Sequence, residues 1–275
     1  MTTIYKNFTE ALKQLFTEYE IVAEVGPGIY IYPTISILQY INPKFYIAID
    51  GATSFDHCWQ RFSQIGGIKE YLKRIKEYFG NFPENLISLN SLSHSLPLKS
   101  KSIDNILFIK TLWKLTDGAL NIWDKIKNSI IDNYSRMGIS HLNEKEYKQL
   151  SILTYDLLVL EEARKVGRKG IAIIPESESI EEEMIKDLKI YSEIIGDEFS
   201  ISKVESPTWT IKRNGKEVEI GHWQDNSSRS LIYFYINNSK PISRDELIEY
   251  LRRSKYNLCE SKSFRDLCHR LFLSW

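Results

Sequence analysis

Apolar positions along the chain follow two alternating patterns: short unbroken apolar runs, and longer stretches in which apolar residues recur every three or four positions. The unbroken runs are rich in β-branched residues, which is typical of strands covered on both faces. They lie at Ile21–Val25, Phe45–Ile49, Leu86–Leu89, Ile103–Ile109 and Ile171–Ile174. The helical patterns lie at Phe8–Tyr19, Ile35–Ile41, Phe55–Phe79, Ser151–Val166 and Glu181–Ile195. Strands alternating with helices of this length predict right-handed crossovers and a parallel, doubly wound α/β sheet.

The pattern changes after Asp197, where the predicted strands follow one another without helices between them. Phe199–Lys212 and Glu217–Ile220 flank an Asn214-Gly215 pair, which is a strong signal for a hairpin turn. Leu231–Ile236 forms a further strand. We therefore expect a mostly parallel seven-stranded sheet that ends in an antiparallel hairpin, with helices on both faces and an extra helix at each end of the chain.

One domain over residues 1–239 is expected, because a chain of 275 residues can bury one full core. The segment at about 112–150 is long for a simple crossover, and we expect it to form a helical insertion. Ser243–Glu246 has the sequence of a capping box, so residues 240–275 are expected to form a C-terminal helical extension.

Composition narrows the classes of protein to which the chain can belong. Apolar residues make up 43% and charged residues 26%, which is ordinary for a soluble globular protein. Lysine plus arginine equals aspartate plus glutamate at 36 each, so no overall field directs the protein to nucleic acid or to an anionic membrane. Three scattered cysteines without a CxxC pair predict neither a disulfide framework nor a metal site. The N-terminus lacks a signal-peptide pattern and no apolar run approaches the ~20 residues that span a bilayer, so we expect a soluble, cytoplasmic protein.

The stretch IVAEVGPGIY at residues 21–30 ends a predicted strand in an acid and a glycine-rich turn. In an open parallel sheet, ligands bind where the carboxyl ends of the strands meet diverging connections, and Glu24 to Gly28 would lie there. Gly26 and Gly28 allow the backbone to approach a ligand where a Cβ would collide, and the N–H groups of such a turn favour electron-rich ligand atoms. A tight strand-to-helix bend also needs glycine in many folds, so the turn alone leaves both interpretations open.

Asp50 favours the ligand interpretation, because it ends the next predicted strand, beside the glycine-rich turn. A carboxylate at that position can accept two hydrogen bonds from vicinal ribose hydroxyls, which indicates a nucleoside-bearing cofactor. A nicotinamide or flavin dinucleotide enzyme would favour GxGxxG, but Ile31 occupies the third glycine position. The dinucleotide alternative is therefore disfavoured, although it stays open.

Four segments, in the same order along roughly Ile21–Pro175, resemble the motifs of the class I S-adenosylmethionine-dependent methyltransferases. AEVGPG at 23–28 resembles the acidic, glycine-rich first motif, and AID at 48–50 resembles the second. LPLKSKSIDNILFIKTLW at 96–113 and EEARKVGRKGIAIIPE at 161–176 are similar to the segments around the fourth and fifth strands of that family. The predicted terminal hairpin also matches the family's sheet. The resemblance implies a methyltransferase with S-adenosyl-L-methionine as its cofactor.

The resemblance implies binding roles for the residues of the first two motifs. Glu24, Gly26 and Gly28 would hold the methionine part of the cofactor. Asp50, with Gly51 after it, would bind the ribose hydroxyls.

Residues beyond the third and fourth strands complete the implied site. Asn90 and Ser91 would border the adenine, and Lys110 and Thr111 would lie near the reactive methyl group. Many relatives carry an acidic residue at the position of Asn90, and Tyr30 replaces a frequent small residue of the first motif. These departures keep open a second hypothesis, a methyltransferase-fold binding or scaffold subunit without independent catalysis.

Methyl transfer from a sulfonium is an in-line displacement, so alignment and desolvation can supply much of the acceleration. A general base matters mainly when the acceptor must lose a proton before it attacks. The candidate bases are His57, His94, His141, His222 and His269. For each of them a solvated or structurally hydrogen-bonded ring is the simpler interpretation, so the catalytic residues stay unassigned.

Recognition of the acceptor is expected from segments outside the shared core. Thr111–Tyr147 carries aromatic residues that could form a lid or pack on the sheet. Basic and aromatic residues after Lys240 could bind RNA, but the acids between them favour a solvated pair of amphipathic helices. No DPPY or NPPY sequence follows the fourth predicted strand, which disfavours methylation of exocyclic amino groups of bases. The acceptor, whether small molecule, protein or RNA, and the oligomeric state stay open, and no membrane partner is expected.

Overall fold

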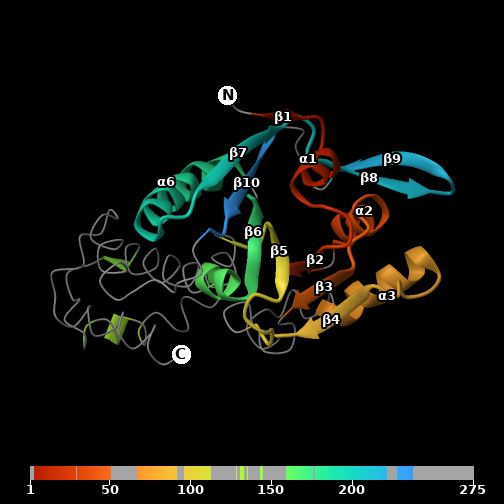
Figure 1. The fold of residues 1–275 in the computed structure, drawn as a ribbon, viewed down its shortest axis with the longest axis horizontal. Helices are drawn as coiled ribbons and strands as arrows, with labels where there is room; N and C mark the ends of the chain where they lie inside the picture. Colours follow the sequence, from red (N-terminus) through yellow and green to blue (C-terminus); the bar gives the residue numbers. More distant parts are fainter. Residues whose placement is uncertain are drawn as a thin grey trace.

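The computed structural model describes residues 3–28, 30–50, 67–91, 96–112, 159–175, 177–221 and 228–237, together with residues 128, 131, 132, 135, 143 and 144. An eight-stranded sheet lies at the centre of these residues (Figure 1). Its strands are β1 (Ile4–Tyr5), β2 (Ile21–Val25), β3 (Phe45–Asp50), β4 (Leu86–Asn90), β5 (Ile103–Ile109), β6 (Gly167–Ile174), β7 (Phe199–Val204) and β10 (Arg229–Tyr235). Their order across the sheet is β1-β7-β10-β6-β5-β2-β3-β4.

The sheet is doubly wound and mostly parallel, as the sequence predicts. Strands β4, β3, β2, β5 and β6 pair in parallel with one another. Strand β10 runs antiparallel to both β6 and β7. After β1 at one edge, the chain enters the centre of the sheet with β2, moves outward to β4 at the other edge, and then returns to β5 on the other side of β2. This reversal of direction beside β2 is the kind of position at which open α/β sheets bind ligands.

Helices cover both faces of the sheet. They are α1 (Phe8–Leu15), α2 (Tyr32–Tyr40), α3 (Gly67–Phe79) and α6 (Glu178–Ile195), and residues 159–166 are also helical. The first three pack on one face, where their buried apolar side chains meet Val22, Tyr46 and Ala48. Residues 159–166 and α6 pack on the opposite face.

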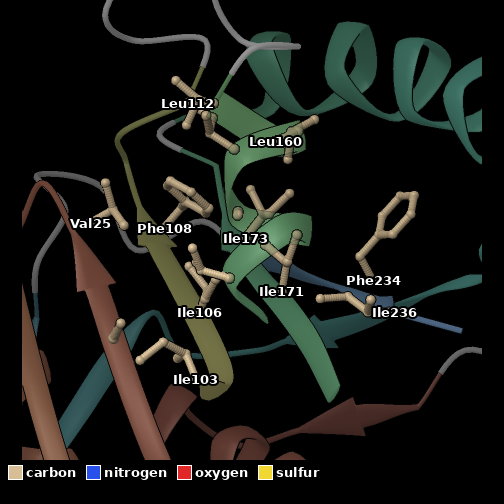
Figure 2. Packing of buried hydrophobic residues seen from close by; sticks show 14 of the residues in the cluster. Val25, Ile103, Ile106, Phe108, Leu112, Leu160, Ile171, Ile173, Phe234 and Ile236 are labelled. Atoms are coloured by element: carbon tan, nitrogen blue, oxygen red, sulfur yellow. The ribbon is translucent and has the colours of Figure 1, made fainter. Parts of the chain in front are cut away.

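Alternation along each strand creates two separate cores. On β2, Val22 belongs to the core under α1, α2 and α3, whereas Ala23 and Val25 belong to the opposite one. Figure 2 shows this second core, in which Phe108 of β5 and Ile173 of β6 lie beneath the helix of residues 159–166. Because both faces are covered, the central strands are apolar along nearly their whole length.

One predicted strand is wrong, since Phe199–Lys212 is divided into two elements. The first part is β7, and the second is β8 (Thr208–Arg213), which pairs with β9 (Lys216–Gly221) in a separate two-stranded sheet. Pro207 between them has no N–H to donate to a ladder, so the strand cannot continue through it. The Asn214-Gly215 turn is confirmed, with φ of 54° and 75° at its two residues.

The β8–β9 hairpin lies beside α1 and α2 and does not extend the main sheet (Figure 1). It is held there by Trp209 and Ile211, which are buried in the core under these helices. The antiparallel end of the main sheet is instead the β7–β10 pair. The eighth strand, β1, pairs in parallel with β7 through only two residues.

Most of the predicted insertion at 112–150 and the whole predicted extension at 240–275 lie outside the described residues. Within the described part of the chain, none of the helices has the length and apolar character that crossing a membrane requires.

Candidate functional site at the carboxyl edge of the sheet

The carboxyl ends of β2, β3 and β4 bring the predicted binding residues to one edge of the sheet. Val25 of β2 pairs with Ile49 of β3, and the N–H of Gly26 donates to the carbonyl of Ile49 at 2.7 Å. Asp50 pairs with Asn90, the last residue of β4. Gly26, Asp50 and Asn90 therefore end three adjacent strands at the same level.

Ser91 also lies at this edge, since its N–H donates to the carbonyl of Asp50 at 3.2 Å. Asp50 is half-buried and Asn90 is exposed. Gly51 lies outside the described residues, as do the five candidate histidines.

Strand β5 adds Lys110 and Thr111 on the other side of β2. The hydroxyl of Thr111 lies 3.0 Å from the carbonyl of Val25 and 3.1 Å from that of Ile109, so it can donate to either. It thereby ties the end of β5 to the start of the glycine-rich turn. Thr111 thus lies directly beside the predicted site of the cofactor's methionine part.

The two glycines of the turn meet different requirements. Gly26 has φ of +72°, and a Cβ at this position would lie 2.7 Å from Cγ2 of Thr111. Gly28 has φ of +58°, but a Cβ there would have no described heavy atom within 4 Å. Gly26 is therefore required by the bend and by its contact with Thr111, whereas none of the described residues fills the space beside Gly28.

Lys110 follows β5 directly and has a left-handed conformation, with φ of 55°, which is uncommon for a residue with a side chain. Its N–H donates to the carbonyl of Ile174 at 2.9 Å, and its Nζ lies 5.6 Å from the centre of the Tyr30 ring. The ring of Tyr30 is 46% exposed.

The carboxyl group of Glu24 is only 1% exposed and lies under α2 and α3. Its Oε2 accepts hydrogen bonds from the hydroxyl of Thr34, at 3.2 Å, and from that of Tyr46. The hydroxyl of Tyr71 lies 2.7 Å from that of Thr34. Glu24 is thus enclosed by three hydroxyl groups from α2, β3 and α3.

Burial dominates the electrostatics of this group and raises the pKa of Glu24 to about 7, from an ordinary value of 4.5. The hydrogen bonds from Tyr46 and Thr34 oppose the increase in pKa, and the nearby charge of Asp50 adds to it. Burial likewise holds the pKa of the Tyr46 and Tyr71 phenols well above their usual range. Within the described residues, no lysine or arginine forms an ion pair with Glu24.

The sequence-based prediction did not include Thr34, Tyr46 or Tyr71 in the site. A signal for them does exist, because Tyr46 places a phenol within the apolar run Phe45–Ile49 and Thr34 interrupts an apolar helix. A polar group at a position that faces the core needs a hydrogen-bond partner. For both residues the partner is Glu24, the acid of the first motif.

The described residues form a doubly wound α/β sheet, and the predicted binding residues Glu24, Gly26, Asp50 and Asn90 lie at or next to the carboxyl ends of its adjacent strands. The reversed strand β10 and the parallel strands around β2 are the arrangement implied by the resemblance to the class I methyltransferases.

No family model and no curated protein matches the sequence. Among solved structures, the chain is similar to an S-adenosylmethionine-dependent methyltransferase from Aquifex aeolicus, with 17% identity over 82% of this chain and 86% of that one and a TM-score of 0.41. It is also similar to magnesium protoporphyrin IX methyltransferase from Synechocystis PCC 6803, solved with bound S-adenosylmethionine, at 10% identity, 82% and 74% coverage and a TM-score of 0.37. A methyltransferase from Haloferax volcanii, solved in complex with the Trm112 methyltransferase activator, has 9% identity, 80% and 83% coverage and a TM-score of 0.41.

Proposed function

We propose that the protein is an enzyme that transfers a methyl group from S-adenosyl-L-methionine to an acceptor that is a small molecule, a protein or an RNA. One observation carries the proposal: the turn at Gly26–Gly28, the carboxylate of Asp50 and the Asn90-Ser91 pair end three adjacent strands at one edge of the sheet. Each of these groups has the chemistry that one part of the cofactor needs.

The residues at the edge fit the parts of the cofactor in the order of the strands. The space beside Gly28, in which no described residue lies within 4 Å of a Cβ, would admit the methionine part, and a Cβ at this position would obstruct it. Asp50 at the end of β3 would accept hydrogen bonds from the ribose hydroxyls, as an acid in this position does in other doubly wound folds. Asn90 and Ser91 at the end of β4 would border the adenine.

When bound, the cofactor supplies a methyl group activated by a sulfonium. The role of the chain is then to hold the acceptor in line with that methyl group and to exclude water. Thr111 and Lys110 lie on the side of the turn where β5 ends, and the hydrogen bond from Thr111 fixes this segment against Val25. Both residues would therefore border the reactive methyl group and the acceptor.

Calorimetric titration with S-adenosylhomocysteine tests the proposal. We expect saturable binding by the intact protein and a loss of affinity of at least about tenfold in Asp50→Ala, because a hydrogen bond to a charged group contributes about 1.5–3 kcal/mol. Glu217→Gln is the matched control, since Glu217 is an exposed carboxylate on the β8–β9 hairpin that accepts from Tyr40 at 2.8 Å. No binding by the intact protein, or equal binding by Asp50→Ala, would contradict the proposal. Binding of a nicotinamide dinucleotide instead would support the oxidoreductase alternative.

A second candidate function is a binding or scaffold subunit that keeps the cofactor site but does not catalyse transfer alone. It is favoured by the Tyr30 ring, which stands beside Lys110 where related proteins frequently have a small residue. Incubation with methyl-labelled S-adenosylmethionine and host extract, followed by fractionation, distinguishes the two. Label in one acceptor fraction with the purified chain supports the enzyme, whereas label only after a partner chain is added supports the subunit.

A further inference from the structure

The hydroxyl groups around Glu24 form a chain of hydrogen bonds that ends at its carboxyl group. The hydroxyl of Thr34 has one proton, and if this proton is donated to Oε2 of Glu24, then the 2.7 Å contact with Tyr71 requires the phenol of Tyr71 to be the donor. Tyr46 donates to the same Oε2. All four side chains are buried, with at most 1% of any of them exposed.

Hydrogen bonds from the described residues reach only one of the two carboxyl oxygens of Glu24. Both donors, Thr34 and Tyr46, are bound to Oε2, and no described residue donates to Oε1. A carboxylate has about four acceptor positions, and buried polar atoms are normally satisfied. Oε1 therefore has the capacity to accept a further donor at the base of the glycine-rich turn, two residues before Gly26.

We propose that Thr34, Tyr46 and Tyr71 are positioning residues that hold Oε2 of Glu24, so that Oε1 accepts a hydrogen bond from the ammonium group of the cofactor's methionine part. This inference rests on the proposed function. The three residues touch Glu24 directly or through one another, and they do not touch the reacting atoms. Their effect on binding is exerted through the orientation and the charge of Glu24.

This arrangement couples cofactor binding to the loss of a proton from the carboxyl group of Glu24. An ammonium group next to Glu24 favours the ionised carboxylate, so binding by the protonated form releases one proton from Glu24 to the solvent. The groups that act on this equilibrium are Tyr46 on β3, Tyr71 on α3, Thr34 on α2 and the carboxylate of Asp50 at the end of β3. The hydroxyls of Tyr46 and Thr34 stabilise the ionised form, and Asp50 destabilises it.

The test is calorimetric titration of the intact protein with S-adenosylhomocysteine at several pH values between about 6 and 8, in two buffers with different ionisation enthalpies. Since the pKa of Glu24 is about 7, we expect the affinity of the native protein to rise about tenfold over this range, with proton release near neutral pH. Tyr46→Phe should move this rise to higher pH, because it removes a hydrogen bond that lowers the pKa of Glu24. Thr34→Val should move it in the same direction, and Glu24→Gln should abolish it.

Tyr40→Phe is the matched control, because it also removes a phenol that donates to a carboxylate, that of Glu217, outside the site. It should leave the pH profile unchanged. Cooperative unfolding is measured first for each variant, to establish that it is folded. If Tyr46→Phe does not unfold cooperatively, Thr34→Val takes its place, because it makes the smallest change in volume.

Two failures are distinguishable in this experiment. If the native protein does not bind at any pH, the proposed function is wrong. If it binds and Asp50→Ala weakens binding, but Tyr46→Phe and Thr34→Val keep the native affinity and pH profile, the positioning role is wrong while the proposed function stands.

Discussion

Replacement of Glu24 by glutamine should stabilise the fold at neutral and alkaline pH while it removes the charge that the site needs. The carboxyl group is 1% exposed, and its pKa is raised to about 7 from an ordinary 4.5. The native state therefore holds this proton at pH values where the unfolded chain has already released it. Stability is consequently lost as the pH rises from about 4.5 to about 7, and the full loss persists above that range.

The size of the effect follows from the difference between the two pKa values. One pKa unit corresponds to about 1.36 kcal/mol, so the ionised, buried carboxylate lowers the free energy of unfolding by about 3 kcal/mol above pH 7. Glutamine is neutral at every pH and can still accept from Tyr46 through its amide oxygen. The free energy of unfolding of Glu24→Gln, relative to the native protein, should thus increase by about 3 kcal/mol between about pH 4 and pH 8.

Urea unfolding followed by circular dichroism at each pH measures this difference. Glu217→Gln, an exposed carboxylate on the hairpin, should show no comparable change with pH. If the difference in free energy of unfolding between Glu24→Gln and the native protein is independent of pH, or falls as the pH rises, then Glu24 is not a buried acid that lacks a cationic partner among the described residues, and the reasoning is refuted.

Three further predictions concern the turn and the opposite end of the sheet. Gly26→Ala should lower the free energy of unfolding by about 1–3 kcal/mol in chemical denaturation, because its φ of +72° is unfavourable and its Cβ would lie 2.7 Å from Cγ2 of Thr111. Gly28→Ala should lower the free energy of unfolding by only about 1 kcal/mol, since no described atom is near its Cβ. It should nevertheless weaken S-adenosylhomocysteine binding in calorimetry by more than its effect on stability explains. Unchanged affinity would contradict an approach of the ligand at Gly28. Asp197→Ala should destabilise the protein by about 3–5 kcal/mol in thermal or urea unfolding, because Arg164 donates to Asp197 at 2.9 Å, both side chains are buried and the guanidinium would lose one of its carboxylate partners; a loss below about 1 kcal/mol would contradict this role.

The parts of the fold that the sequence predicts best are those in which the apolar pattern alone decides. Strands β2 and β5 begin and end at the predicted residues, since both are covered on each face and flanked by turns. Strand β6 begins four residues before the predicted Ile171, at Gly167. The first residues of β6 include Arg168 and Lys169, which are exposed and form ion pairs with Asp104 and Glu20, respectively. Because they are charged, the apolar pattern does not include them in the strand.

The long-range contacts could not be predicted in the same way. Pro207 is a local signal for the division of Phe199–Lys212, but the place of the β8–β9 hairpin depends on the docking of Trp209 against Phe8 of α1. Strand β1 is too short to give a pattern. Likewise, the close approach of Thr111 to Gly26 joins residues far apart in sequence. The positions of Asp50 and Asn90 were predictable, because parallel strands end at the same edge of a sheet.

The most direct test of the central claim is the stoichiometry of S-adenosylhomocysteine binding to the intact chain at neutral pH. We expect one saturable site per chain, with an affinity that falls at least about tenfold in Asp50→Ala and is unchanged in Glu217→Gln. An intact, folded protein that gives no heat and no change in melting temperature at millimolar ligand would contradict it.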